Sequence, residues 1–419
     1  MCSLPGKIKY FHSWTKEKPS EIPYGTQLIN NNDVKAVVDA LYSPLIAQGP
    51  RVERFEKSLA EKCDAEYAVV VNSGTSALHI ACLAAGVKRG DEVITSPNTF
   101  VASANCTIYC GGKPVFADID KRTYNISPSE IEKRITQNTK AIIPVHFAGQ
   151  SCDMESISQI VKEAERKYGH KIFIIEDGCH ALGSEYKSSK VGACAYSDMT
   201  VMSFHPVKHI TTGEGGAVLT NDKFLSEKLV IFRSHGITKE PEKLINKDSY
   251  FASTSINNTP YINQWWYYEQ IDLGYNYRMT DLQGALGLSQ LEKLDYFCKK
   301  RSDIVRRYNK AFNGLKNIQI PFESKECDSN FHLYVLLIDF DQMDIKRSQY
   351  MIELKKKGIQ TQVHYIPVNI QPYYQEKFRT GWGDCPNAEE YYQKCISIPL
   401  FPSMTNNEVE RVINSIKGD

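Results

Sequence analysis

Short apolar segments alternate with amphipathic segments over most of the chain. The apolar segments are bounded by turn residues and are too short for typical helices, so each predicts a buried strand. They lie at 67–71, 92–96, 114–118, 140–145, 171–175 and 199–202, and a further one follows Gly216. The segments between them predict helices, chiefly at 77–85, at 101–109, after the capping Ser127 and at 154–167. About seven strands separated by helices predict an α/β fold whose mainly parallel sheet is covered on both faces.

The two ends of the chain show other patterns. Residues 1–30 have no regular spacing and predict an N-terminal arm. Residues 31–285 predict the large domain, which opens with helices at 32–42, capped by Asn31 or Asn32, and at 52–62. Residues 286–419 predict a small α/β domain, joined to the large one by one or two helices within 279–309. Its expected strands are 331–340 and 359–363, and its expected helices are 348–357, 386–395 and 406–416.

The stretch 237–270 is polar and aromatic without a regular spacing, and the sequence gives no role for it.

Composition limits the class of protein. The chain has 419 residues, of which 42% are hydrophobic and 24% charged, and its formal net charge is +1. A balanced charge gives no reason to expect binding to nucleic acid or to an anionic membrane. The twelve cysteines are scattered without a C-x-x-C pair or metal-ligand spacing, which predicts a reducing compartment and no metal site. The N-terminus lacks the apolar core of a signal peptide, and no run is long enough to cross a membrane. We therefore expect a cytoplasmic protein.

The stretch from Asp198 to Thr220 holds the first candidate for chemistry. A strand leads through Ser203 to Lys208, and the run Gly213-Glu-Gly-Gly216 precedes the next strand. A crowded, partly desolvated loop can fix an amine and lower its pKa, as a nucleophilic lysine requires. The alternative is an ordinary solvated lysine on a hairpin.

Further candidates follow other strands of the predicted sheet, where ligands of such folds bind. Gly74 and Thr75 stand between a strand and a helix, where backbone N–H groups favour an anion, although a tight turn with a serine cap is equally consistent. Asp177 ends an apolar strand and needs a partner, which is either a ligand or a structural ion pair. His180 lies three residues further on. Phe100 is either a stacking aromatic or a core residue.

These candidates are all expected at the same edge of the predicted sheet. A phosphate cradle, a stacking aromatic, a carboxylate and a lysine are the groups that hold pyridoxal 5′-phosphate. The lysine binds the cofactor covalently, the carboxylate meets its ring nitrogen, and N–H and hydroxyl groups meet its phosphate. Neither the P-loop nor the dinucleotide-binding spacing is present.

Seven motifs follow one another along the chain: Gln48-Gly-Pro50, Asn72-Ser-Gly-Thr-Ser-Ala-Leu78, Ser96-Pro-Asn-Thr-Phe-Val-Ala102, Glu176-Asp-Gly-Cys-His-Ala-Leu-Gly183, Ser203-Phe-His-Pro-Val-Lys-His209, Gly213-Glu-Gly-Gly216 and Gly274-Tyr-Asn-Tyr-Arg-Met-Thr-Asp281. In these motifs the chain resembles the DegT/DnrJ/EryC1/StrS family of nucleotide-sugar aminotransferases, which are fold-type I pyridoxal-phosphate enzymes. The resemblance covers about residues 21–415. The family often has alanine where this chain has Gly178 and Cys179, which are small-for-small changes.

The resemblance implies a role for each matching residue. Lys208 is the catalytic residue, which binds the cofactor and moves the proton between donor and acceptor carbons. The other cofactor-binding residues are Gly74, Thr75 and Ser203 on the phosphate, Phe100 on the ring face, Asp177 on the ring nitrogen and His180 near the ring hydroxyl. Asn276 reaches the phosphate in the partner subunit, so the resemblance implies a homodimer.

Within the family, the chain looks most like the 4-aminotransferases of the pseudaminic acid pathway. The similar residues are Ser203 to Lys208, Trp266 to Glu269 and Val363 to Tyr374. The implied acceptor is a UDP-2-acetamido-2,6-dideoxy-4-keto-hexose and the implied donor is L-glutamate. Gln48, His364 and Tyr365 are candidate substrate contacts, because loops that follow a rigid scaffold carry function.

Three alternatives remain open at this point. The chain could aminate another nucleotide-linked 4-keto sugar. It could be a dehydratase, since some members of the family use histidine in place of the lysine and His209 stands beside Lys208. It could also be a non-catalytic protein on the same scaffold, although such a protein would be expected to lack Lys208 or Asp177.

Overall fold

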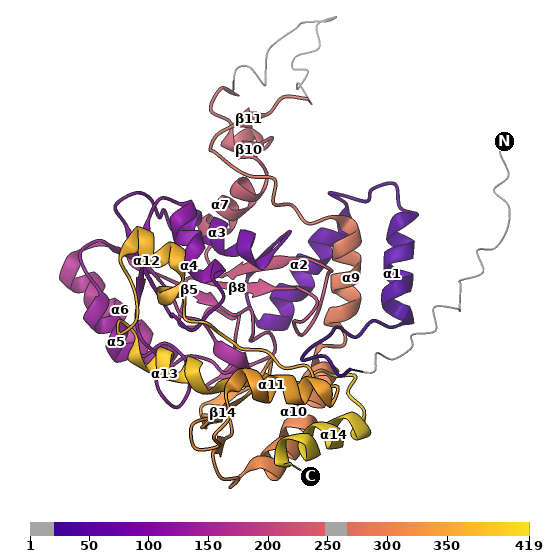
Figure 1. Cartoon of the computed structure of the whole chain (residues 1–419). Coiled ribbons are helices and arrows are strands. Elements are labelled where there is room, and N and C mark those ends of the chain that lie inside the picture. Colours follow the sequence, from indigo (N-terminus) through magenta and orange to yellow (C-terminus); the bar gives the residue numbers. More distant parts are fainter. Residues whose placement is uncertain (1–20, 248–265, 419) are drawn as a thin grey trace, which may run out of the picture.

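The computed structural model describes residues 21–247 and 266–418, and its centre is a seven-stranded sheet (Figure 1). The strands stand in the order β1-β9-β8-β5-β4-β2-β3. They are β1 (Tyr67–Val71), β2 (Glu92–Thr95), β3 (Lys113–Phe116), β4 (Thr139–Ile143), β5 (Phe173–Asp177), β8 (Met199–Ser203) and β9 (Gly216–Thr220). Each lies at a predicted apolar segment, within a few residues at either end.

The sheet is parallel except at one strand. The pairs β2–β3, β2–β4, β4–β5 and β5–β8 are parallel. β9 is antiparallel to both β8 and β1, because the loop that carries Lys208 returns the chain directly beside β8. The prediction of a mainly parallel seven-stranded sheet is confirmed. The carboxyl ends of β1, β5 and β8 consequently meet at one edge.

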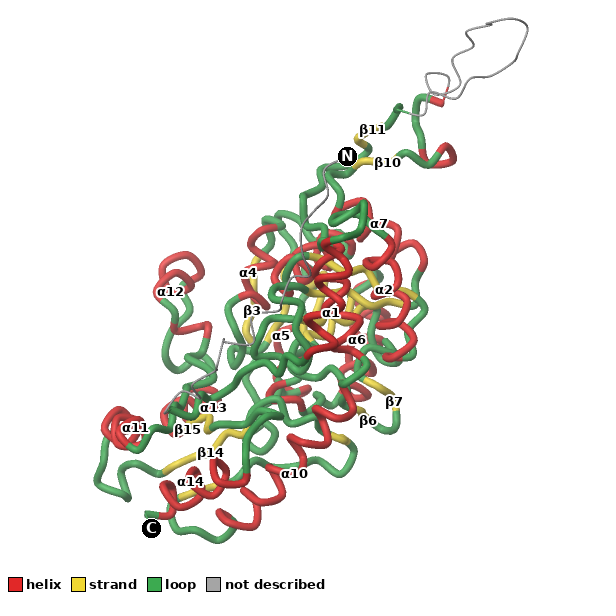
Figure 2. The backbone as a smooth tube through the Cα atoms, turned by 90° about the vertical axis from the view of Figure 1, so that its right-hand side faces the viewer, coloured by secondary structure: helices red, strands yellow, loops and turns green. Residues whose placement is uncertain are grey.

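Helices cover both faces of this sheet (Figure 2). Val69, Val93 and Val201 point to one face, where they share a core with α3 (Gly74–Ala84), α4 (Ala102–Tyr109) and α7 (Lys223–Arg233). Their neighbours Val70 and Ile94 point to the other face, in accordance with the two-residue period of a strand. The helices on that face are α2 (Pro50–Cys63), α5 (Pro128–Arg134), α6 (Met154–Tyr168) and α9 (Asp281–Leu291). α1 (Asn31–Leu41) packs on α9.

The C-terminal part builds a second, smaller sheet in the order β12-β14-β15. Its strands are β12 (Ile318–Gln319), β14 (Tyr334–Ile338) and β15 (Cys395–Ile398). A separate core joins this sheet to α10 (Leu294–Phe312), α11 (Arg347–Lys356) and α14 (Asn406–Lys417). α12 (Pro372–Phe378) and α13 (Pro386–Lys394) belong to a further core that reaches Phe116 and Phe147 of the large sheet region. The predicted boundary at residue 286 falls inside α9 and stays a prediction.

Two local predictions are wrong. The cap of α1 is Asn30, whose side chain accepts hydrogen bonds from the N–H groups of Asn32 and Asp33. Residues 359–363 form no regular strand. They make only single bridges, Ile359 with Ile22 and Gln362 with Ser397. Ile359 is apolar because it fills the small core, and not because it belongs to a ladder.

The remaining elements are short. β10 (Ile237–Thr238) pairs with β11 (Glu269–Gln270) at the base of an arm that projects from the body (Figure 1). A third small sheet has the order β13-β6-β7, with β6 (Glu185–Tyr186), β7 (Ser189–Lys190) and β13 (Cys327–Asp328). The described residues also contain the short 3-10 helices η1 (Phe147–Gly149), η2 (Pro241–Lys243) and η3 (Val368–Ile370). The predictions for residues 1–20 and 248–265 lie outside the described residues. No helix in the described part of the chain is long and apolar enough to cross a membrane.

Candidate active site

A pocket of about 680 Å³ opens at the carboxyl ends of β1, β5 and β8. The segment from Gln362 to Ile366 forms its opposite wall. Nine of the eleven predicted site residues line it: Gly74, Thr75, Phe100, Asp177, His180, Ser203, Lys208, His364 and Tyr365. The other two, Gln48 and Asn276, are exposed and are not among the residues that line this pocket.

The predicted anion cradle lies at the N-terminus of α3. The Ser73 side chain caps this helix and accepts a hydrogen bond of 3.0 Å from the Ser76 N–H. The N–H groups of a first helical turn have no partner inside the helix and favour an anion. Ser203 closes the cradle from β8, because a Cβ on Gly74 would stand only 3.0 Å from the Ser203 Cβ. A Cβ on Gly216 would stand 2.5 Å from the Ser73 carbonyl oxygen, so the glycine run allows β9 to pass directly beneath the cradle.

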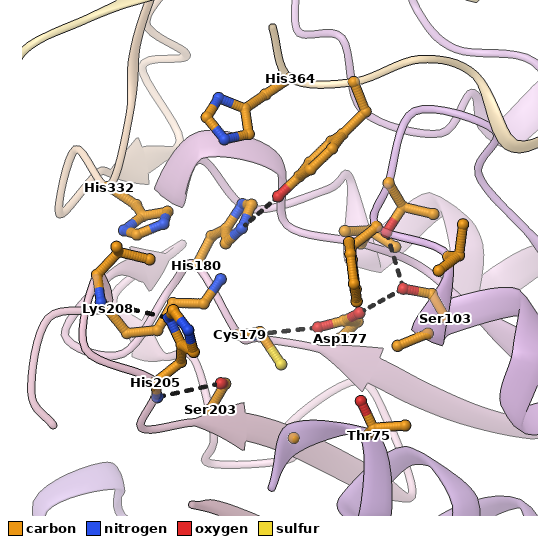
Figure 3. A pocket seen from close by; sticks show the side chains of 18 of the residues that line it. Thr75, Ser103, Asp177, Cys179, His180, Ser203, His205, Lys208, His332 and His364 are labelled. Carbon is orange, nitrogen blue, oxygen red and sulfur yellow. Dashed lines mark hydrogen bonds between the residues drawn. The ribbon is translucent and has the colours of Figure 1, made fainter. Parts of the chain in front are cut away.

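Asp177 presents a buried carboxylate at the end of β5 (Figure 3). Its Oδ2 accepts a hydrogen bond of 2.7 Å from Ser103 Oγ, and its Oδ1 accepts one of 3.1 Å from the Cys179 N–H. The two hydrogen bonds fix the orientation of the carboxylate. The sequence reasoning missed Ser103, although this residue directly follows the Ser96 to Ala102 motif.

Lys208 extends from the β8–β9 loop into the pocket, close to the His180 ring (Figure 3). Its own N–H donates to the His205 carbonyl oxygen at 2.8 Å, which fixes the backbone of the loop. Desolvation by the pocket walls lowers the pKa of the Lys208 amine, although Cys179 and Asp177 oppose this shift. A lowered pKa increases the share of neutral amine, which is the form that can attack a carbonyl or accept a proton.

Replacing Lys208 by methionine should stabilise the cofactor-free protein in a pH-dependent way. The folded-state pKa of this lysine lies below its unfolded value, so its desolvation cost is fully present at pH values below the folded-state pKa. The cost falls as pH rises through that pKa, and it vanishes above the unfolded value. Thermal unfolding of both proteins across pH should therefore show a stability gain for Lys208→Met that shrinks toward alkaline pH. A gain that is constant with pH would contradict the lowered pKa.

Imidazole rings form the wall on the side of the C-terminal segment. His180 Nδ1 accepts a hydrogen bond of 3.3 Å from the Ala148 N–H, and its Nε2 lies 3.2 Å from Tyr365 Oη. Burial lowers the pKa of His180 well below its usual value, so the neutral ring carries its proton on Nε2. Burial also lowers the pKa of His364 to about 3. The sequence reasoning missed His332, whose ring centroid lies 4.4 Å from that of His180. No local motif marks His332.

His209 does not share the pocket with Lys208. Its ring is buried and its Nε2 donates toward the Asn330 carbonyl oxygen at 3.0 Å. Burial lowers its pKa well below the usual value. His209, the residue that motivates the dehydratase alternative, is not among the residues that line the pocket. Its ring instead forms a hydrogen bond in the protein interior.

The pocket fits pyridoxal 5′-phosphate by the chemistry of its donor groups. The N-terminus of α3, together with the hydroxyls of Thr75 and Ser203, suits the phosphate. The Asp177 carboxylate suits a protonated ring nitrogen, and the Lys208 amine suits the aldehyde. Phe100 lines the same pocket, and 60% of its surface is exposed. No group of three or more His, Cys, Asp or Glu side chains in the described ranges could hold a metal ion.

Comparisons with known proteins match almost the whole chain. The model of the DegT/DnrJ/EryC1/StrS aminotransferase family matches residues 27–417. Spore coat polysaccharide biosynthesis protein SpsC of Bacillus subtilis is 40% identical over 397 residues, covering 94% of this chain and 96% of that protein. GDP-perosamine synthase of Escherichia coli O157:H7 is 35% identical over 94% of this chain and 97% of its own. The solved structure of Helicobacter pylori PseC, an aminotransferase involved in the biosynthesis of pseudoaminic acid, superposes with a TM-score of 0.83 at 33% identity, covering 95% of this chain and 98% of that one.

Proposed function

The chain belongs to the DegT/DnrJ/EryC1/StrS aminotransferase family, and from this premise we propose that it aminates C4 of a UDP-linked 2-acetamido-2,6-dideoxy-4-keto-hexose. It is a sugar aminotransferase of fold-type I, and its family uses pyridoxal 5′-phosphate. The proposed donor is L-glutamate, which leaves as 2-oxoglutarate while the C4 ketone of the sugar becomes an amine.

The observation that carries this proposal is the presence of Lys208 and Asp177 in one pocket from which His209 is turned away. When bound, pyridoxal phosphate supplies an electron sink and a carrier for the amino group. In the proposed mechanism, Lys208 Nζ takes the proton from the α-carbon of the donor and later delivers a proton to C4 of the sugar. A lysine at this position supports amination over dehydration.

The other site residues bind and orient. Asp177 holds a proton on the ring nitrogen by the attraction of its charge, and the first turn of α3 with Ser203 binds the phosphate. His180 directs its Nε2–H group toward Tyr365 Oη, and both side chains line the pocket. His364 and Tyr365 are proposed to contact the sugar. Gln48 and Asn276 are exposed on this protomer, and we propose that they serve the site of a partner subunit in a homodimer.

Similarity to an aminotransferase of pseudoaminic acid biosynthesis supports an acceptor of that pathway, and we propose that this acceptor is UDP-linked. Similarity to GDP-perosamine synthase supports the second candidate, a 4-keto sugar linked to a different nucleotide. We further propose that the enzyme works in the cytoplasm, where free thiols persist. All cysteines in the described ranges are unpaired.

The enzyme should prefer one nucleotide on the acceptor. We expect kcat/KM for the UDP-linked 4-keto sugar to exceed that for the GDP- and dTDP-linked forms by at least about tenfold, which corresponds to roughly 1.4 kcal/mol of differential binding. The measurement is the steady-state rate with L-glutamate over this panel. A preference for the GDP-linked form would replace the proposed acceptor by the second candidate and leave the aminotransferase assignment intact.

A further inference from the structure

The Ser103 hydroxyl of α4 forms a hydrogen bond with Asp177 at the end of β5. Inside a helix, a serine that does not point to solvent commonly bonds a carbonyl of the preceding turn. Ser103 lies in the first turn of α4. Its Oγ stands 2.7 Å from Oδ2 of Asp177, which is 74 positions away in the sequence (Figure 3). Ser103 is only 1% exposed. The hydroxyl is therefore aimed at the carboxylate and does not satisfy its own backbone.

A second hydroxyl stands behind it and fixes the direction of the hydrogen bonds. An ionised carboxylate can only accept, so Ser103 must donate its single hydrogen to Asp177. Thr99 Oγ1 lies 2.8 Å from Ser103 Oγ and must then donate to it. Thr99 and Asp177 are 3% and 5% exposed, so the two hydroxyls and the carboxylate are almost fully buried at the pocket wall. Hydrogen bonds that point toward one charge in a desolvated site reinforce one another.

Ser103 also holds the backbone beside the stacking candidate. Its N–H donates to the Phe100 carbonyl oxygen at 3.2 Å, and Phe100 directly follows Thr99 in the chain. The second oxygen of Asp177 accepts the Cys179 N–H. Each carboxylate oxygen thus accepts a hydrogen bond from the protein, and lone pairs remain for a donor that enters the pocket. Ser103 therefore contacts both the segment that carries Phe100 and the carboxylate of Asp177.

We propose that Ser103 is a positioning residue that holds the Asp177 carboxylate in place, aimed at the ring nitrogen of the cofactor. This inference rests on the proposed function, because it takes the ring nitrogen as the partner of Asp177. In this proposal Ser103 acts through Asp177, which it contacts. Thr99 is the outer member of the same chain and contributes less.

The test compares two ligands on the cofactor-free full-length protein. One is pyridoxal phosphate and the other is its analogue in which carbon replaces the ring nitrogen, both titrated by absorbance. Loss of a hydrogen bond to a charged group corresponds to an expected fall in pyridoxal phosphate affinity of about tenfold to a hundredfold for Ser103→Ala. The analogue should bind the wild type and Ser103→Ala equally, since it has no ring nitrogen for Asp177 to meet. Thr99→Val should show the same selectivity with a smaller loss.

Thr107→Val is the matched control. Thr107 lies on the same helix, is fully buried, and its hydroxyl has no hydrogen-bond partner. Its replacement should leave the affinity for both ligands unchanged. An equal loss for both ligands in Ser103→Ala would make Ser103 merely structural and would overturn the inference, as would no loss for pyridoxal phosphate. A wild type that binds both ligands equally would instead overturn the pairing of Asp177 with the ring nitrogen, on which the proposed function depends.

Discussion

Lys208→Ala should lose turnover by about a thousandfold or more while the protein keeps its fold. The missing amine removes both the covalent anchor of the cofactor and the group that moves the proton, and positioned acid–base groups alone contribute about 10²- to 10⁴-fold. The measurement is the rate of keto-sugar amination per folded enzyme, with circular dichroism to verify the fold. A small primary alkylamine added to Lys208→Ala should restore part of the rate, because the truncated side chain leaves room in the pocket.

Lys190→Ala is the matched control for this prediction. Lys190 pairs with Asp64 on the surface at 2.9 Å and lies outside the pocket. Its removal should leave the rate within about twofold of the wild type, since surface ion pairs contribute little. Wild-type turnover in Lys208→Ala would overturn the assignment of the reactive amine.

Asp177→Ala should lower turnover by roughly 10²- to 10³-fold, the second-largest effect that we expect. Removing one member of a buried charge pair costs about 3 to 5 kcal/mol, because the ring nitrogen then loses its proton or carries an unpaired charge. A cofactor analogue methylated on the ring nitrogen carries the positive charge permanently. It should therefore restore more activity to Asp177→Ala than pyridoxal phosphate does.

Asp153→Ala separates this effect from the general loss of a carboxylate. Asp153 accepts hydrogen bonds from the Ser156 N–H and the Tyr186 hydroxyl at the start of α6, away from the pocket. Its removal should cost about 1 kcal/mol of stability as a lost helix cap, with no change of cofactor preference. If the methylated analogue restored nothing to Asp177→Ala, the carboxylate would not act through the ring nitrogen.

The strands and several of the candidate site residues are predictable from the sequence, because both depend on short-range patterns. The mainly apolar run 171–175 marks a buried strand, and Asp177, two residues after this run, is therefore expected at the ligand-binding edge. Lys208 follows the neighbouring strand by the same rule. The first turn of α3 follows β1 in the same way.

The remaining contacts depend on packing between distant segments. Ser103 meets Asp177 only because α4 packs against the face of the sheet, and His332 meets His180 only because the C-terminal part folds back over the pocket. Neither contact leaves a periodic signal. Residues 359–363 show the reverse case, since their apolar residue Ile359 resembles part of a strand but serves a core. Asn276 is predicted from the family resemblance and Gln48 from its place in a loop, and the proposed roles of both residues need a partner subunit.

The most direct test of the central claim is the mass of the product formed by the wild-type enzyme from the UDP-linked 4-keto sugar and ¹⁵N-labelled L-glutamate. We expect a sugar in which an amine carrying the heavy nitrogen replaces the C4 oxygen, together with one equivalent of 2-oxoglutarate. A sugar that has lost a hydroxyl and contains no heavy nitrogen would identify a dehydratase. An unchanged sugar with every nucleotide in the panel would contradict the proposed activity.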